Sequence, residues 1–268
     1  MKIAAQTIGY FMPYLQKGES VDFNFAKETL NNIKKFGYDG VQLSGFGKLT
    51  NELIDFYKKT CEDLELEIVA THINFQDLTE NLELVKKAQK EWKCKLCGLG
   101  SMPLQFQKNI DTYLEFTQLV NKIAQELAIE NIKFIYHMHA FEFIKYDNKF
   151  GLEILMDNTD KKNVGLLIDT YWAQYGGVNP VDLIRKYSDR LDTIHLKDMK
   201  IIPTGDTRFE LGKQVICHIG EGNLNFLPII SEAKKLNFQW LIIEQDYSLD
   251  KDINYCYGES LKTLKNLI

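Results

Sequence analysis

The sequence predicts an α/β fold, a single-domain (β/α)8 barrel that spans residues 1–268. Short β-rich runs alternate with longer amphipathic runs, and eight such units follow one another without a linker or low-complexity stretch. The length of 268 residues suits one domain of this kind. An open, doubly wound sheet is the alternative, but no glycine-rich phosphate turn follows the first strand in the sequence.

The expected strands are short apolar runs bounded by turn residues. They are Ile3–Ile8, Val41–Leu43, Glu67–Thr71, Leu96–Leu99, Asn131–Tyr136, Asn163–Ile168, Leu191–Ile194 and Gln239–Ile243. Between them, apolar residues recur at helical spacing, and glycine-containing turns such as Gly37-Tyr38-Asp39-Gly40 end the helices. The expected helices cover about Asn24–Phe36, Asn51–Leu64, Asn81–Trp92, Asp111–Leu127, Gly151–Asn158, Pro180–Tyr187, Leu227–Leu236 and Ile253–Leu267, with a long loop before Leu227.

Composition and charge exclude several classes of protein. The formal net charge of −5 argues against a protein that tracks a nucleic-acid backbone. No window approaches the roughly 18 apolar residues of a membrane-spanning helix, and the start of the chain is too brief and polar for a signal peptide. Five irregularly spaced cysteines do not suggest a disulfide framework. We therefore expect a reduced, cytoplasmic protein that binds neither nucleic acid nor membrane.

Cys94 and Cys97 form a C-x-x-C motif, which is also found in redox and zinc sites. Zinc needs two further ligands at matching spacing, and Cys61, Cys217 and Cys256 do not supply a second pair. Buried structural cysteines are the better interpretation.

Four chemically reactive residues follow four successive strand runs: Glu142, Asp169, His195 and Glu244. The carboxyl ends of parallel barrel strands lie at one end of the barrel, so we expect these side chains to meet there. Each has an ordinary alternative, such as a helix cap, a core histidine or a loop acid. Together, three carboxylates and one imidazole predict a site for one divalent metal ion, with manganese, magnesium or cobalt favoured and zinc as an alternative.

Other polar or aromatic residues follow the same strand runs and are expected to bind substrate. They are His72, His137, His139, Trp172, Lys197 and Glu221. Lys197 either reaches a substrate oxyanion or is a solvated loop lysine. Glu221, between two glycines, either closes over the site or faces solvent. His137 and His139 share one side of any strand they occupy, where one binds substrate or either orients Glu142.

At these residues the chain resembles the xylose-isomerase-like sugar-phosphate isomerase/epimerase superfamily, which includes hydroxypyruvate isomerase, ketose 3-epimerase and inosose dehydratase relatives. The resemblance lies mainly in the second half, in Tyr136-His137-Met138-His139-Ala140-Phe141-Glu142-Phe143, Ile168-Asp169-Thr170-Tyr171-Trp172, Ile194-His195-Leu196-Lys197-Asp198, Gly220-Glu221-Gly222-Asn223 and Ile243-Glu244-Gln245-Asp246. In the first half, Asp39-Gly40-Val41-Gln42-Leu43-Ser44 and Ala70-Thr71-His72 agree as well.

The resemblance implies one divalent metal ion held by Glu142, Asp169, His195 and Glu244, with Glu142 and Glu244 as the catalytic acid/base pair. The chain departs from the family pattern in two places. Met138 replaces an asparagine common between the two histidines, and Trp172 stands where ketose epimerases have a substrate-binding histidine. The specific epimerase activity is therefore left open.

The expected function is that of a metal-dependent sugar isomerase or epimerase acting on a keto- or aldo-sugar through a metal-stabilised enediolate. The alternative is a metal-dependent lyase or dehydratase, like inosose dehydratase or acting on an oxidised glycoside. DNA repair at abasic sites needs more histidines than the five present, and a non-catalytic sugar-binding barrel is a further alternative. The expected partners are a carbohydrate substrate and, as in many relatives, further copies of the chain.

Overall fold

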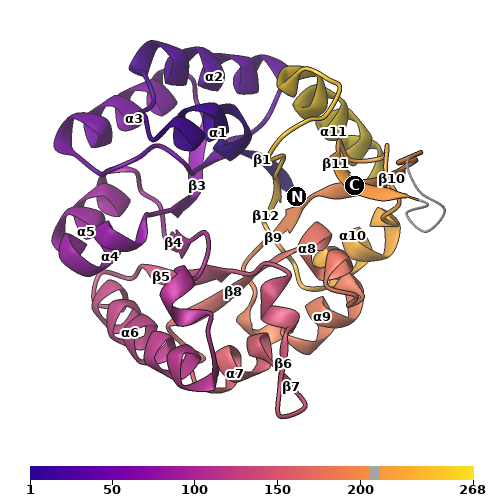
Figure 1. The fold of residues 1–268 in the computed structure, drawn as a ribbon. Helices are drawn as coiled ribbons and strands as arrows, with labels where there is room; N and C mark the ends of the chain where they lie inside the picture. The colour runs from indigo at the N-terminus through magenta and orange to yellow at the C-terminus, as the bar shows by residue number, and fades with distance from the viewer. Residues whose placement is uncertain (206–211) are drawn as a thin grey trace.

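The computed structural model describes residues 1–205 and 212–268, and its central feature is a closed barrel of parallel strands (Figure 1). Around the barrel the hydrogen-bonded order is β1-β12-β9-β8-β5-β4-β3-β2. The barrel strands are β1 (Lys2–Gln6), β2 (Gly40–Leu43), β3 (Glu67–His72), β4 (Leu96–Leu99), β5 (Lys133–His137), β8 (Val164–Asp169), β9 (Ile194–Leu196) and β12 (Trp240–Ile243). The predicted fold class is confirmed.

Helices surround the barrel and connect its strands (Figure 1). They are α1 (Ile8–Lys17), α2 (Phe23–Phe36), α3 (Asn51–Asp63), α4 (Phe75–Glu80), α5 (Leu82–Glu91), α6 (Ile110–Ala128), α7 (Gly151–Asp157), α8 (Thr170–Tyr175), α9 (Pro180–Lys186), α10 (Phe226–Lys235) and α11 (Ile253–Leu267). The first outer helix, α2, begins where the Asp22 side chain accepts hydrogen bonds from two backbone N–H groups, and it ends at Gly37 with φ 93°. Within the described ranges, no helix is both long enough and apolar enough to cross a membrane.

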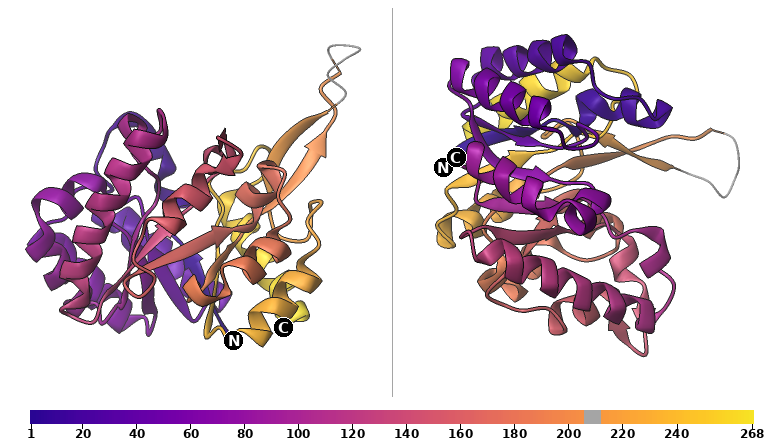
Figure 2. Two further views of the ribbon diagram at one scale, coloured as in Figure 1. Left: turned by 90° about the horizontal axis from the view of Figure 1, so that it is seen from below. Right: turned by 90° about the vertical axis from the view of Figure 1, so that its left-hand side faces the viewer.

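Several segments differ from the sequence expectation, among them the short helices α4 and α8, which no expected helix covers. The residues after β1 form α1, although the predicted strand extended to Ile8. Within the predicted long loop, β10 (Asp198–Ile202) pairs antiparallel with β11 (Lys213–Cys217), and this hairpin projects from the barrel (Figure 2). Residues 206–211 of that loop lie outside the described part of the chain. A shorter hairpin pairs β6 (Lys145–Tyr146) with β7 (Lys149–Phe150).

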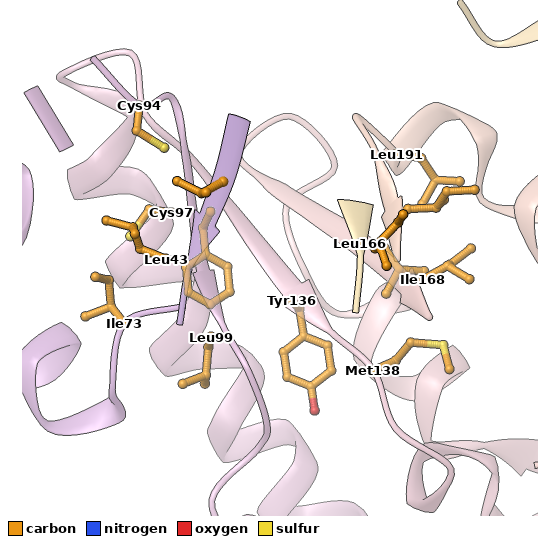
Figure 3. Close-up of a cluster of buried hydrophobic side chains, with 14 of the residues drawn as sticks. Leu43, Ile73, Cys94, Cys97, Leu99, Tyr136, Met138, Leu166, Ile168 and Leu191 are labelled. Carbon is orange, nitrogen blue, oxygen red and sulfur yellow. The ribbon is translucent and has the colours of Figure 1, made fainter. Parts of the chain in front are cut away.

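Alternation along the strands separates two apolar layers. A small cluster fills the inside of the barrel, formed by Ala4, Val69, Ala70, Ile135, Leu167 and Ile242. A larger cluster lies between the strands and the helices. Figure 3 shows members of this outer cluster, among them Tyr136, Leu166 and Ile168. Because successive side chains on a strand point to opposite faces, the residues two positions beyond Ile135, Leu167 and Ile242 also point inward.

Candidate metal centre

At the carboxyl ends of the strands, beyond the apolar layer, the side chains that point into the barrel are polar. Two residues beyond Ile135, Leu167 and Ile242 stand His137, Asp169 and Glu244. His195 lies opposite Asp169 in the pairing of β9 with β8. One ligand atom from each of these four buried residues lies within 4.8 Å of the others. The barrel thus brings two imidazoles and two carboxylates to one point.

The four groups fit a divalent cation. His137 Nε2, Asp169 Oδ2, His195 Nδ1 and Glu244 Oε2 are buried and have no hydrogen-bond partner among the described residues. His137 Nε2 lies 3.6 Å from the Asp169 oxygen and 3.4 Å from the Glu244 oxygen, and His195 Nδ1 contacts the same Glu244 oxygen. Because buried polar atoms rarely go without a partner, four of them aimed at one point indicate a shared ligand such as a metal ion.

Each histidine is oriented by its other ring nitrogen. His137 Nδ1 lies 3.0 Å from the Gly100 carbonyl oxygen, and His195 Nε2 lies 2.6 Å from Gln42 Oε1. Both partners are acceptors, so these nitrogens carry the protons and donate. The opposite nitrogens then keep lone pairs for a metal ion. Gln42, in β2, was not in the predicted ligand or substrate set.

Electrostatics favour ionised carboxylates at this point. Burial raises the pKa of Glu244, but Lys197, His195 and His137 outweigh it and hold that pKa well below its ordinary value. Burial also opposes protonation of His137. Without a bound ion, however, Glu244 and Asp169 outweigh that effect and raise the pKa of His137 to about 10. The site is therefore built to hold positive charge.

The structure places Glu142 away from this group, although the sequence assigned it to the metal and to catalysis. Its buried carboxylate accepts hydrogen bonds from the Tyr136 hydroxyl and, at 2.8 Å, from the His139 backbone N–H. Tyr136 belongs to the outer apolar cluster, so Glu142 faces that side. The reason is local: β5 extends one residue beyond the predicted strand, and His137 occupies its inward-facing end. His137, rather than Glu142, joins the cluster with Asp169, His195 and Glu244.

Lys197 is fully buried among carboxylates. Its Nζ lies 2.9 Å from Asp246 Oδ2, 3.1 Å from Asp169 Oδ2 and 3.4 Å from Glu244 Oε1, the last two in ion-pair rather than hydrogen-bond geometry. Burial lowers the pKa of Lys197, but the three carboxylates outweigh burial and hold it well above its ordinary value. The solvated-loop alternative is therefore wrong. The three carboxylates also balance the combined charge of the ammonium and a divalent cation.

A cavity of about 520 Å³ opens over the centre, and several of the predicted substrate residues line it: His72, His137, His139 and Trp172. Within the described chain, His72 Nε2, His139 Nδ1 and Trp172 Nε1 are buried and have no hydrogen-bond partner. Burial, reinforced by His137, lowers the pKa of both His72 and His139 well below the ordinary value, so both rings are neutral. These atoms are available to bind substrate hydroxyl or carbonyl groups.

Glu221 does not line this cavity. Its carboxylate accepts from Lys200 Nζ at 2.8 Å and from Lys251 Nζ at 2.6 Å, and His218 Nδ1 lies 2.9 Å away. Burial opposes ionisation, but these partners lower the pKa of Glu221 to about 2. The residue joins the base of the β10–β11 hairpin to the segment before α11, and the structure does not bring it to the substrate cavity.

The C-x-x-C cysteines do not approach this centre. All five cysteines are free and buried. Burial raises the pKa of the Cys94 thiol to about 12 and that of Cys97 further, so both are neutral packing groups.

Comparisons with known proteins give consistent relatives. A family model described as a xylose isomerase-like TIM barrel matches residues 30–267. An inosose dehydratase from Geobacillus kaustophilus is 30% identical over 148 residues, which cover 52% of this chain and 46% of that protein. The chain thus spans about half the length of the first curated relatives it matches.

Solved structures of similar shape cover nearly the whole chain. A sugar phosphate isomerase/epimerase from Parabacteroides distasonis has a TM-score of 0.73 at 23% identity and covers 98% of this chain and 93% of its own. A 3-keto-D-glucoside 4-epimerase from E. coli has a TM-score of 0.69 at 17% identity and covers 99% of each chain. These likenesses establish the arrangement of the backbone.

Proposed function

The chain belongs to the xylose isomerase-like TIM-barrel family, as its sequence motifs indicated, and from this premise we propose that it is a divalent-metal-dependent sugar isomerase or epimerase. Its substrate is a keto- or aldo-sugar or a close carbohydrate derivative. The observation that carries the proposal is the convergence within 4.8 Å of four buried ligand atoms that have no hydrogen-bond partner among the described residues, at the ends of four barrel strands.

His137, Asp169, His195 and Glu244 hold the metal ion in this proposal. The ion supplies Lewis-acid stabilisation of the negative charge that develops when a proton leaves the carbon beside a carbonyl. With two imidazoles and two carboxylates, the donor set favours manganese, cobalt or zinc over magnesium, which prefers oxygen ligands alone.

Proton transfer falls to the residues that line the cavity. Glu244 lines it, and its low pKa keeps it ionised as the base. The unpartnered ring nitrogens of His72 and His139, neutral in the free protein, are the candidates that take up a proton from a substrate hydroxyl and pass it on, in the place that the sequence assigned to Glu142. Such a positioned acid/base group contributes roughly 10²–10⁴-fold in rate. Glu142 supports His139 indirectly, because its carboxylate accepts a hydrogen bond from the His139 backbone N–H.

Dehydration is the second candidate, and the similarity to inosose dehydratase favours it. The same base removes the proton beside the carbonyl, and the opposing acid protonates a β-hydroxyl group, which leaves as water. The two reactions therefore use one set of residues and differ in where the second proton goes.

One experiment separates these functions. The purified protein is loaded with Mn²⁺, Co²⁺ or Zn²⁺, its metal content is measured, and a panel of keto-sugars and inososes is incubated with it in heavy water. Deuterium at the carbon beside the carbonyl without loss of water supports isomerisation or epimerisation, whereas an unsaturated product supports dehydration. Failure of every metal to bind at one equivalent would overturn both.

The Asp169→Asn variant tests the centre itself. Asp169 Oδ1 accepts from the Trp172 backbone N–H at 2.9 Å, and asparagine retains that cap while it replaces the metal-facing oxygen with an amide nitrogen. We expect metal affinity to fall at least roughly 100-fold with an unchanged fold. Asp63→Asn, in an exposed ion pair with Lys59, is the matched control and should bind metal as the unmodified protein does.

A further inference from the structure

A second cavity adjoins the metal-site cavity beside helix α1. It has a volume of about 330 Å³, and Met12, Gln16, Asp246 and Tyr247 line both cavities. Figure 1 shows α1 lying inside the ring of outer helices, near the mouth of the barrel. Because the same side chains bound both spaces, the two cavities lie side by side, close enough for the two ends of one molecule.

The walls found only in the second cavity are largely apolar and aromatic. Tyr10, Pro13 and Phe25 contribute them. The Tyr10 ring is fixed, because it stacks on Tyr257 at a centroid distance of 5.0 Å and its hydroxyl donates to Asn254 Oδ1 at 3.1 Å. A preformed aromatic wall of this kind suits the apolar face of a sugar ring or an aromatic ring.

The charges around the second cavity are already paired. Among the described residues that line it, the charged side chains are Asp246 and Lys251. Lys251 Nζ donates to Glu221 at 2.6 Å, and Asp246 accepts from Lys197 at 2.9 Å. Neither is free to bind a phosphate or a carboxylate, so the cavity favours a neutral occupant.

We propose that the two cavities form one site for a two-ring glycoside. One ring lies at the metal centre, and the second ring, either a sugar or an aromatic aglycone, lies against Tyr10, Pro13 and Phe25. The inference rests on the proposed carbohydrate function and deepens it, since it names glycosides whose first ring carries a ketone, rather than free monosaccharides, as the substrate class.

Binding of matched glycosides tests the inference. The probes are methyl and phenyl β-glycosides of D-glucose, D-galactose and D-xylose, together with cellobiose, and the Mn²⁺-loaded protein is titrated by calorimetry. We expect the phenyl glycoside, cellobiose or both to bind about tenfold more tightly than the methyl glycoside of the same first sugar, because the second ring is buried. The phenyl and cellobiose arms distinguish an aromatic aglycone from a second sugar.

Substitutions of residues that line the second cavity test whether the tighter binding of two-ring probes arises there. Ser248→Trp fills a position that lines only this cavity, and Ser248→Ala is the matched control that removes the same hydroxyl without filling the space. We expect S248W to abolish the preference for two-ring probes over the methyl glycoside while it retains the affinity for the methyl glycoside. S248A should keep that preference. Should S248W fail to fold, Phe25→Ala removes one apolar wall and should reduce the preference several-fold.

The outcomes are distinguishable. Equal affinity for methyl and two-ring probes, or a preference that survives both S248W and F25A, overturns the second subsite and leaves the sugar function standing. Binding of none of the probes by the metal-loaded protein also overturns the second subsite, whereas the carbohydrate function is tested separately by the panel of keto-sugars and inososes.

Discussion

Glu142→Gln distinguishes a buried supporting carboxyl from a metal ligand. The glutamine oxygen can accept from the His139 backbone N–H as the carboxylate does, and its amide can donate to the Tyr136 oxygen. The substitution therefore preserves shape and hydrogen bonding while it removes the ionisable group.

The magnitude follows from the environment of the carboxyl. Burial raises the pKa of Glu142 to about 7 from an ordinary value of 4.5, against the opposing effect of its hydrogen bonds. The folded protein thus retains this proton where the unfolded chain has lost it, and ionisation lowers the free energy of unfolding as the pH rises from 4.5 through 7. At about 1.4 kcal/mol per pKa unit, the penalty reaches roughly 3 kcal/mol above pH 7.

Urea denaturation of the metal-free protein at pH 4.5, 6 and 8 measures this penalty. We expect the difference in unfolding free energy between E142Q and the unmodified protein to shift by roughly 3 kcal/mol in favour of the variant across this range. Glu19→Gln, at an exposed position, should follow the unmodified protein throughout. E142Q should also bind Mn²⁺ within a few-fold of the unmodified affinity. Parallel stability profiles, or loss of metal binding as severe as in D169N, would refute the supporting role and restore Glu142 to the ligand set.

Three further predictions concern the centre. Gln42→Leu removes the partner that orients His195, so Mn²⁺ affinity measured by calorimetry should fall about 10–100-fold, and an unchanged affinity would contradict the orienting role. Lys197→Met leaves buried carboxylates without their cation and should lower the unfolding free energy of the metal-free protein by about 3–5 kcal/mol in urea; a loss below about 1 kcal/mol would contradict the ion-pair assignment. Removal of metal by a chelator, compared with free Mn²⁺ at 100 times its Kd, should cost about 2.7 kcal/mol and lower Tm by roughly 5–10 °C, and an unchanged Tm would argue against binding to the folded state.

The barrel and three of the four residues at the centre were predicted from the sequence for one physical reason. A barrel strand ends where its apolar run ends, and the next inward-facing residue meets its counterparts from the other strands. Asp169, His195 and Glu244 were identified in this way, and the structure brings them together. For β5 the prediction chose Glu142, six residues beyond the expected end of the strand, whereas the residue in the cluster is His137, the last residue of β5.

What the sequence did not reveal depends on partners distant in the chain. Glu221 pairs with Lys200 and Lys251, which lie 21 and 30 residues away in the sequence. The sequence therefore did not indicate that the Glu221 carboxylate has partners. The β10–β11 hairpin joins strands separated by a long polar connection, which reads as a loop. Helix α1 contains Pro13, a residue that usually marks the end of a helix.

Four of the chain's five histidines gather at the mouth of the barrel. The His137 ring lies 5.2 Å from His72, 4.8 Å from His139 and 4.7 Å from His195, measured between ring centroids. Only His218 stands apart from the cavity, beside Glu221. Imidazole resonances in a proton NMR spectrum therefore report almost entirely on the centre, with His218 as an internal reference. Occupancy by ions or sugars can thus be followed in the unlabelled protein without introducing a probe.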